Sequence, residues 1–253
     1  MHLILMVGFL FLKTGEKFAT QEAAGPTVKA LTEYVGGETF EPRVLNDPGQ
    51  AVEYCAASKP ALGIVTPGFF LTYGKQLGME PVLETKREGI TAERCVLIAP
   101  KDASDDLAAW PGKTIATPLA AEQRYVVGVL LAGKLGEEVR LKATTDVEGA
   151  VFDLVEKAKG AADAVLMDEA AWKLFESDSE LGPKLKVIYR SDELPRDLVV
   201  KFGDPEAGKA VARLKAMNAD EAGQKVLRSI RVESFTEIDQ DRLAKARKLF
   251  NGQ

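Results

Sequence analysis

Short apolar runs alternate with amphipathic stretches along almost the whole chain. Each apolar run has the length of a buried strand, and each amphipathic stretch repeats its apolar positions at helical spacing. The runs predict strands over residues 3–12, 40–45, 61–65, 82–85, 94–99, 113–116, 139–143, 164–167, 186–189 and 198–202. The stretches predict helices over residues 26–35, 48–58, 67–77, 104–110, 118–132, 146–159, 169–176, 205–216, 220–229 and 239–250. This alternation is typical of an α/β fold with largely parallel sheets.

The order of strand and helix restarts near residue 94, which predicts two lobes rather than one continuous sheet. We assign residues 1–93 plus 193–253 to lobe one and residues 94–192 to lobe two. The C-terminal helices have no strands of their own, so we expect them to pack back on lobe one. The chain would then pass between the lobes twice. Such a double-crossover hinge favours closure on a ligand held between the lobes.

The first apolar run, residues 3–12, could also pass for part of a signal peptide. It lacks a basic segment before it and a small-residue cleavage site after it, so we interpret it as the first core strand. On this interpretation an exported protein has lost its leader before this numbering begins.

Several strand-to-helix junctions place a helix start directly after a strand. They are Thr66-Pro67-Gly68, Thr117-Pro118-Leu119, Thr145-Asp146 and Met167-Asp168-Glu169. Ligands bind at this end of the strands in open α/β sheets, and the helix dipole there favours an anion. Alternatively, each Thr or Asp is simply an N-cap.

Composition and motifs exclude several classes of function. The hydrophobic fraction of 46% and charged fraction of 28% are those of a globular protein. The net charge of −5 argues against binding to a nucleic-acid backbone. His2 is the single histidine, which argues against a histidine base or a multi-histidine metal site. The nucleotide-binding, hydrolase and zinc-protease fingerprints are missing, and we expect no metal and no cofactor.

The two cysteines, Cys55 and Cys95, lie 40 residues apart among apolar neighbours, with no CxxC spacing. We interpret them as buried, reduced thiols that pack as small hydrophobes. A disulfide, or a Cys95 that contacts ligand, is the alternative.

Four stretches resemble the phosphate/phosphonate-type substrate-binding proteins of ABC importers, a branch of the type 2 periplasmic binding proteins. Residues 51–70 resemble the helix, buried strand and ligand-contacting turn of lobe one. Residues 107–116 resemble the entry to lobe two, residues 159–166 its Gly-x-x-Asp-Ala strand, and residues 190–195 the return to lobe one. The resemblance implies a two-lobed type 2 periplasmic-binding-protein architecture.

Two features depart from this family. Its Ser/Thr-rich turn at the start of the lobe-two helix is reduced here to Thr117-Pro118-Leu119-Ala120-Ala121, with one hydroxyl. Its Gly-x-x-Asp before the lobe-one strand is replaced by Ser58-Lys59-Pro60-Ala61-Leu62. We therefore expect weak binding of simple phosphate and a ligand of mixed polarity.

The strand ends also predict the ligand-binding residues. We expect contributions from Phe11, Lys13, Thr66, Gly68 and Phe69 in lobe one and from Thr117, Gln123, Arg124 and Asp168 in lobe two. Phe11 and Phe69 would hold an apolar part of the ligand, and Lys13 or Arg124 would compensate by charge for the missing hydroxyls. Asp168 would suit an amine or a hydroxyl.

The resemblance implies a non-enzymatic, periplasmic protein that binds a small polar or anionic solute and delivers it to a membrane permease. We expect a monomer that binds no nucleic acid. Two alternatives keep the fold, which alone does not decide function. One is a protein that presents its ligand to the sensor of a two-component system. The other is a cytoplasmic enzyme of the menaquinone-pathway type.

Overall fold

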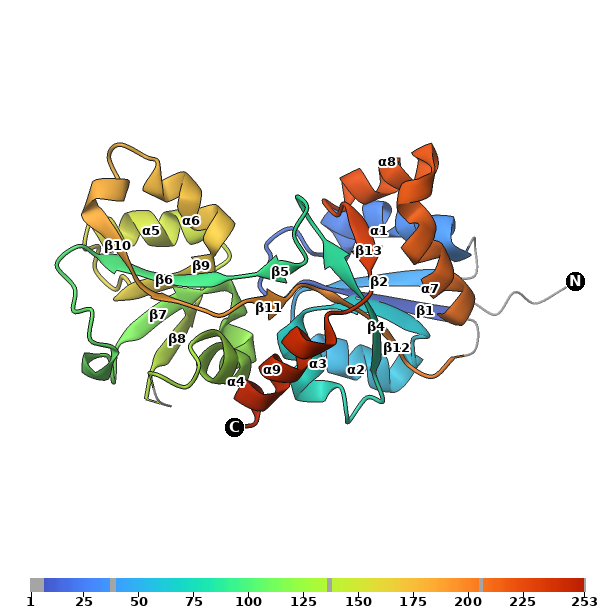
Figure 1. The fold of residues 1–253 in the computed structure, drawn as a ribbon, viewed down its shortest axis with the longest axis horizontal. Helices are drawn as coiled ribbons and strands as arrows, with labels where there is room; N and C mark the ends of the chain where they lie inside the picture. The colour runs from blue at the N-terminus through green and yellow to red at the C-terminus, as the bar shows by residue number, and fades with distance from the viewer. Residues whose placement is uncertain (1–6, 37–39, 136–137, 205–206, 253) are drawn as a thin grey trace, which may run out of the picture. The chain divides into compact units, whose positions relative to one another are not determined.

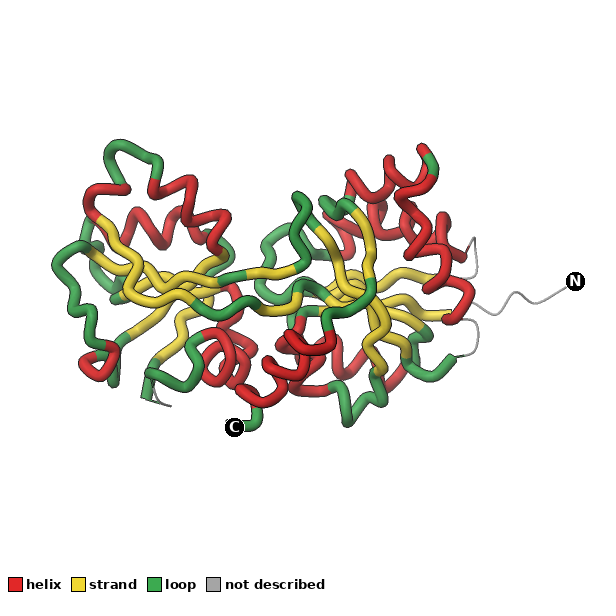
Figure 2. Tube along the Cα trace, in the orientation of Figure 1, coloured by secondary structure: helices red, strands yellow, loops and turns green. Residues whose placement is uncertain are grey.

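The structure is a computed structural model that describes residues 7–36, 40–135, 138–204 and 207–252. The chain divides into two compact units. The first consists of Met1–Ala92 and Pro195–Leu243, and the second of Glu93–Leu194 and Ala244–Gln253. Each unit contains its own sheet with helices on both faces (Figure 2). This is the mixed α/β, two-lobed architecture that the alternating pattern predicts.

The first unit is built on a six-stranded sheet in the order β13-β4-β12-β3-β1-β2. Its strands are β1 (Val7–Leu12), β2 (Phe40–Leu45), β3 (Leu62–Val65), β4 (Glu80–Lys86), β12 (Leu198–Lys201) and β13 (Ser234–Thr236). Helices α1 (Gln21–Gly36), α7 (Ala207–Ala216) and α8 (Glu221–Ser229) cover one face, and α2 (Pro48–Ser58) and α3 (Pro67–Tyr73) cover the other (Figure 1). Strands β2, β1 and β3 are parallel, whereas β12 runs antiparallel to β3.

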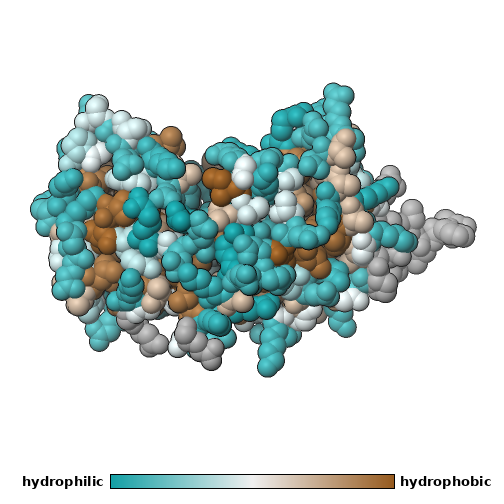
Figure 3. All heavy atoms as spheres, viewed as in Figure 1, coloured by the Kyte–Doolittle hydropathy of each residue, from teal (hydrophilic) through white to brown (hydrophobic). Residues whose placement is uncertain are grey.

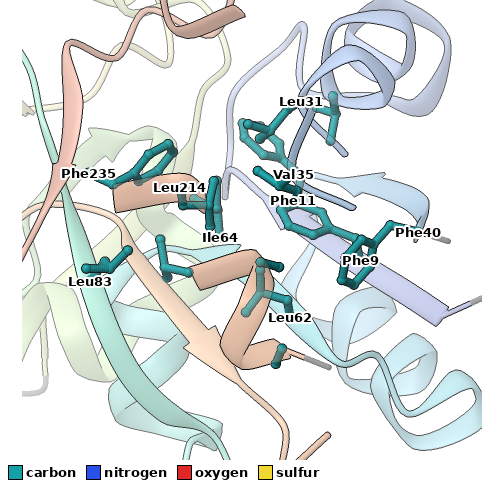
Figure 4. Packing of buried hydrophobic residues seen from close by; sticks show 14 of the residues in the cluster. Phe9, Phe11, Leu31, Val35, Phe40, Leu62, Ile64, Leu83, Leu214 and Phe235 are labelled. Carbon is teal, nitrogen blue, oxygen red and sulfur yellow. The ribbon is translucent and has the colours of Figure 1, made fainter. Parts of the chain in front are cut away.

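Strand β1 is buried on both faces, which explains its continuous apolar sequence. Phe9 and Phe11 join the cluster under α1 and α7, whereas Leu10 and Leu12 join the cluster under α2 and α3. The rings of Phe9 and Phe40 meet edge to face with centroids 6.2 Å apart (Figure 4). The first core strand is therefore confirmed for residues 7–12, and the expected residues 3–6 lie outside the described part.

The second unit has a five-stranded sheet in the order β10-β6-β9-β7-β8. Its strands are β6 (Cys95–Pro100), β7 (Thr114–Thr117), β8 (Arg140–Ala143), β9 (Ala164–Asp168) and β10 (Leu185–Arg190). Helices α5 (Val147–Val155) and α6 (Glu169–Glu176) cover one face, and the short α4 (Gln123–Tyr125) lies on the other (Figure 1). A separate two-stranded sheet pairs β5 (Ala92–Glu93) with β11 (Leu194–Pro195).

Some predicted elements differ from those observed. Helix α1 starts at Gln21 rather than Pro26, because the Thr20 hydroxyl caps it one turn earlier by accepting the Ala23 N–H. The single helix expected over residues 118–132 is instead a 3₁₀ turn, one turn of α-helix and a π-helical segment. The π-helical segment contains Val126, Val127, Gly128 and Val129, which are poor helix formers and account for the irregularity. Residues 104–110 form only a 3₁₀ turn, Leu107–Ala109.

The end of the chain also departs from expectation. Helices α7 and α8 pack on the first unit, as expected. Helix α9 (Gln240–Phe250) begins there too, but residues 244–253 group with the second unit. Lys245 pairs with Asp192 at 3.0 Å, and the Arg124 guanidinium lies over the Phe250 ring. These contacts explain why the last residues group with the second unit, whereas the sequence assigns residues 193–253 to lobe one.

Most of the face in Figure 3 is hydrophilic, with smaller apolar areas. None of the helices in the described part of the chain is long and apolar enough to cross a bilayer.

One ion pair of the first unit is almost completely buried. The side chain of Glu84 is 1% exposed and that of Arg242 is 10% exposed, with Arg242 Nη2 2.7 Å from Glu84 Oε1. Arg242 Nη2 also donates to Thr91 Oγ1 at 3.2 Å, and the Asp239 N–H donates to Glu84. Burial raises the pKa of Glu84, and the Arg242 charge opposes that shift. The pair fixes the start of α9 on strand β4.

Replacing Arg242 by Met should therefore destabilise the protein by about 3 kcal/mol at pH 7, because it leaves the Glu84 carboxylate buried without its cation. The defect should shrink as the pH is lowered. The folded state holds a proton on Glu84 more tightly than the unfolded state does, and protonation removes the unpaired charge. Urea unfolding across the pH range measures both effects.

A Lys215→Met variant is the matched control, because Lys215 forms an exposed ion pair with Glu237. Its effect should stay below about 1 kcal/mol. Equal losses in the two variants would contradict the importance of the buried pair.

Candidate ligand-binding site

The first unit gathers four polar residues at one edge of its sheet. Lys13 and Thr14 follow β1, and Thr66 follows the parallel strand β3. Asp197 precedes β12, which runs antiparallel to β3 and therefore starts at the same edge. The Thr14 and Thr66 hydroxyl oxygens lie 3.5 Å apart, and both residues are buried. These hydroxyls and the two charged groups can bind a small polar solute.

Lys13 is paired by charge within this group. Its ammonium donates a short hydrogen bond to the Asp197 carboxylate, and both side chains are mostly shielded from solvent. Asp197 is held in turn, because its backbone carbonyl accepts the Thr85 N–H at 3.0 Å. The positive charge expected from Lys13 is thus largely balanced inside the first unit.

Thr66 also acts as the N-cap of α3. Its hydroxyl accepts the Phe69 N–H at 3.3 Å, and Pro67 has no N–H to offer. Gly68 is buried in the first turn of this helix.

The two aromatic residues expected at this site lie in the core. Phe69 has no exposed surface and packs with Leu10, Leu12 and the ring of Tyr73. Phe11 is 8% exposed and belongs to the cluster on the opposite face of the sheet. The expectation that Phe11 and Phe69 hold an apolar part of the ligand stays a prediction. Phe11 follows the in-and-out alternation of a strand in a sheet covered on both faces, and Phe69 lies on the buried side of helix α3.

The second unit places Thr117 and Asp168 at the ends of the neighbouring parallel strands β7 and β9. Both side chains act as helix caps. The buried Thr117 hydroxyl accepts the Leu119 N–H at 3.3 Å, and the exposed Asp168 carboxylate accepts the Ala171 N–H at 2.7 Å. The capping alternative thus describes them correctly, and Asp168 has carboxylate surface left for a ligand group.

Gln123 and Arg124 lie further along, in the one-turn helix α4, and both are exposed. Arg124 Nη2 donates to the Phe250 carbonyl at 3.3 Å, and the guanidinium carbon lies 4.1 Å from the Phe250 ring centroid. The sequence predictions miss this contact, together with Thr14 and Asp197. Thr14 was detectable as the residue after Lys13. Asp197 and Phe250 are far away in the chain, and no local signal points to them.

The cysteines are free and buried, as predicted, and they belong to different units. Burial raises the pKa of Cys55 to about 12 and also raises the pKa of Cys95. Neither thiol is suited to nucleophilic chemistry at neutral pH.

A surface cavity of the first unit lies elsewhere. It is lined by β2 and α2, with Glu41, Arg43, Glu53 and Tyr54 among its residues. None of the nine predicted ligand residues lines it.

Comparison with protein families gives a match over residues 9–243 to the family described as "ABC transporter, phosphonate, periplasmic substrate-binding protein". This match covers most of the chain. The chain belongs to this family of transport binding proteins. A search of curated proteins finds no match to the chain.

Several solved structures share the fold of this chain. XAC2383 from Xanthomonas citri, bound to ATP, matches with a TM-score of 0.70 and 16% identity, over 97% of this chain and 96% of that one. A phosphonate-transporter binding protein from Pseudomonas aeruginosa matches with a TM-score of 0.69 and 18% identity, over 97% of this chain and 85% of that one. PhnD1 from Prochlorococcus marinus, in complex with methylphosphonate, matches with a TM-score of 0.66 and 10% identity, over 98% of both chains. At these identities the structures show a common fold, and the ligands belong to those proteins.

The capping geometry of Asp168 yields a stability prediction. Asp168→Ala should lower the free energy of unfolding by about 1 kcal/mol, because the Ala171 N–H loses its acceptor. Asp168→Asn keeps an acceptor oxygen and should stay within about 0.5 kcal/mol of the parent. Denaturant unfolding without ligand measures both, and an Ala variant as stable as the parent would contradict the capping role.

Proposed function

We propose that this substrate-binding protein captures a small organic solute that carries an oxyanion together with a cationic or hydrogen-bonding group. The strand-end residues Lys13, Thr14, Thr66 and Asp197 of the first unit would contact the solute. The observation that carries the proposal is the Lys13–Asp197 ion pair, which puts a carboxylate among the groups available to the ligand.

This arrangement disfavours a simple dianion for a physical reason. A phosphate dianion near Lys13 would also meet the negative charge of Asp197, and the carboxylate has no proton to donate at neutral pH. In the second unit, Pro118 has no N–H and the Leu119 N–H is already taken by Thr117. Each hydrogen bond missing to a desolvated anion costs about 1.5–3 kcal/mol.

A solute with an amine or hydroxyl beside its oxyanion fits these residues better. In the first unit its amine or hydroxyl would donate to Asp197, and its oxyanion would accept from Lys13 and the threonine hydroxyls. In the second unit Asp168 and Arg124 offer the same two functions, a carboxylate acceptor and a cationic donor. Membership of a transport family supports delivery of this solute to the permease of an ABC importer. We propose that the protein acts in the periplasm as a monomer, without catalysis and without nucleic acid.

Calorimetry with inorganic phosphate, methylphosphonate and aminoethylphosphonate tests the proposed ligand class. We expect aminoethylphosphonate to bind at least about tenfold more tightly than phosphate, because it alone offers a cation to Asp197. Sub-micromolar binding of inorganic phosphate would contradict this interpretation of the site. Failure of every oxyanion to bind at millimolar concentration would overturn the proposed ligand class altogether.

Removing the Asp197 charge should reverse this preference. Asp197→Asn removes the carboxylate charge that is hydrogen-bonded to Lys13, so the affinity for inorganic phosphate should rise by about tenfold or more. The affinity for aminoethylphosphonate should fall relative to that for methylphosphonate.

Glu80→Gln is the matched control, because it removes one negative charge from the first unit at an exposed pair with Lys201. It should leave all three affinities near those of the parent. If Glu80→Gln raised phosphate affinity as much as Asp197→Asn, net charge rather than the Lys13–Asp197 pair would set the preference.

A further inference from the structure

Arg124 is held in an unusual way for a surface arginine. The central carbon of the guanidinium lies 4.1 Å from the centroid of the Phe250 ring, and Nη2 donates to the Phe250 carbonyl at 3.3 Å. Phe250 itself is only 8% exposed. One residue thus supplies both a ring and a backbone acceptor, and both hold the same side chain.

The Phe250 ring and carbonyl hold Arg124 without neutralising its charge, so the charge is available to an anionic group of a ligand. Lys13 is balanced by a carboxylate, whereas the partners of Arg124 within the described residues are a ring and a carbonyl. A ring face attracts a cation without neutralising it. A guanidinium has five N–H donors, and the Phe250 carbonyl uses one of them. The remaining donors can take an oxyanion in the two-point geometry that arginine favours.

The local backbone does not explain the position of Arg124. Its own helix, α4, is a single turn between a 3₁₀ segment and a π-helical segment. The last turn of α9 comes close to that π-helical segment, because a Cβ added at Gly128 would lie 3.6 Å from the Leu249 carbonyl oxygen. The irregular α4 constrains the direction of the Arg124 side chain only weakly. The end of α9 therefore helps to fix that direction.

We propose that Phe250 is a positioning residue for oxyanion recognition, acting through Arg124. The last turn of the C-terminal helix would then belong to the binding machinery of the second unit. This inference rests on the proposed function, since it requires that Arg124 contacts an oxyanion. The competing explanation is that Arg124 only anchors the C-terminal helix and has no part in binding.

Isothermal titration calorimetry with methylphosphonate and aminoethylphosphonate separates these explanations. Phe250→Leu removes the ring face but keeps apolar bulk, and it should weaken both affinities by about fivefold. Phe250→Trp keeps a ring face and should bind like the parent. Arg124→Gln should weaken both affinities by about tenfold or more, and adding Phe250→Leu to it should cause no further loss.

Lys245→Gln is the matched control. It removes another contact between the same helix and the second unit, the ion pair with Asp192, and it does not touch Arg124. It should leave both affinities unchanged. A stability measurement on every variant accounts for any loss that comes from loosening the helix alone.

The possible outcomes are distinct. If Phe250→Leu binds as tightly as the parent, or costs as much affinity when added to Arg124→Gln as it costs alone, the positioning role is overturned and the proposed function stands. If Lys245→Gln weakens binding as much as Phe250→Leu, the helix anchor rather than the ring is responsible, and the positioning role again fails. If the parent binds neither phosphonate at millimolar concentration, the proposed ligand class fails and this role fails with it.

Discussion

The burial of the central strands on both faces is the constraint on which the rest of the structure depends. In β1, residues Phe9 to Leu12 fill two different cores, so no polar side chain can be placed before the strand ends. Lys13 and Thr14 directly follow the end of β1, and Thr66 directly follows the end of β3. The polar residues that follow these central strands therefore gather at one end of the sheet, where several strand ends lie together.

The two units hold their cations differently. A partly buried lysine is stabilised when a carboxylate balances it, and Asp197 does this for Lys13. Arg124 is exposed, so its charge needs no such balance, and the Phe250 ring and carbonyl can orient it without cancelling it. The first unit thus holds a balanced pair of charges, and the second unit holds an oriented cation.

The parts of the fold that depend on short-range pattern could be predicted from the sequence. The β1 strand, the Asp47 cap of α2 and the Thr66 cap of α3 each follow from a few adjacent residues. The interrupted helix after Thr117 was missed, because its poor helix formers are outweighed by the apolar periodicity around them. The burial of Phe69 could not be predicted from its position, since a residue beside a strand end can face the core as well as solvent. Asp197 and Phe250 reach their partners over long sequence separations, which single-sequence patterns do not encode.

The fold is retained at low sequence identity because the residues that build the sheets are different from the residues at the strand ends. The relatives with solved structures share 10 to 18% of their residues with this chain, and the alternating apolar pattern is enough to rebuild both sheets. The strand-end residues are not needed for that pattern, so they can change with the ligand. The turn at Thr117 to Ala121 has lost the hydroxyls typical of the family it resembles, yet Thr117 still caps the chain there. An oriented Arg124 would supply by charge what that turn no longer supplies by hydrogen bonding, so that recognition of an oxyanion moves from the backbone of one helix start to a side chain held by another helix.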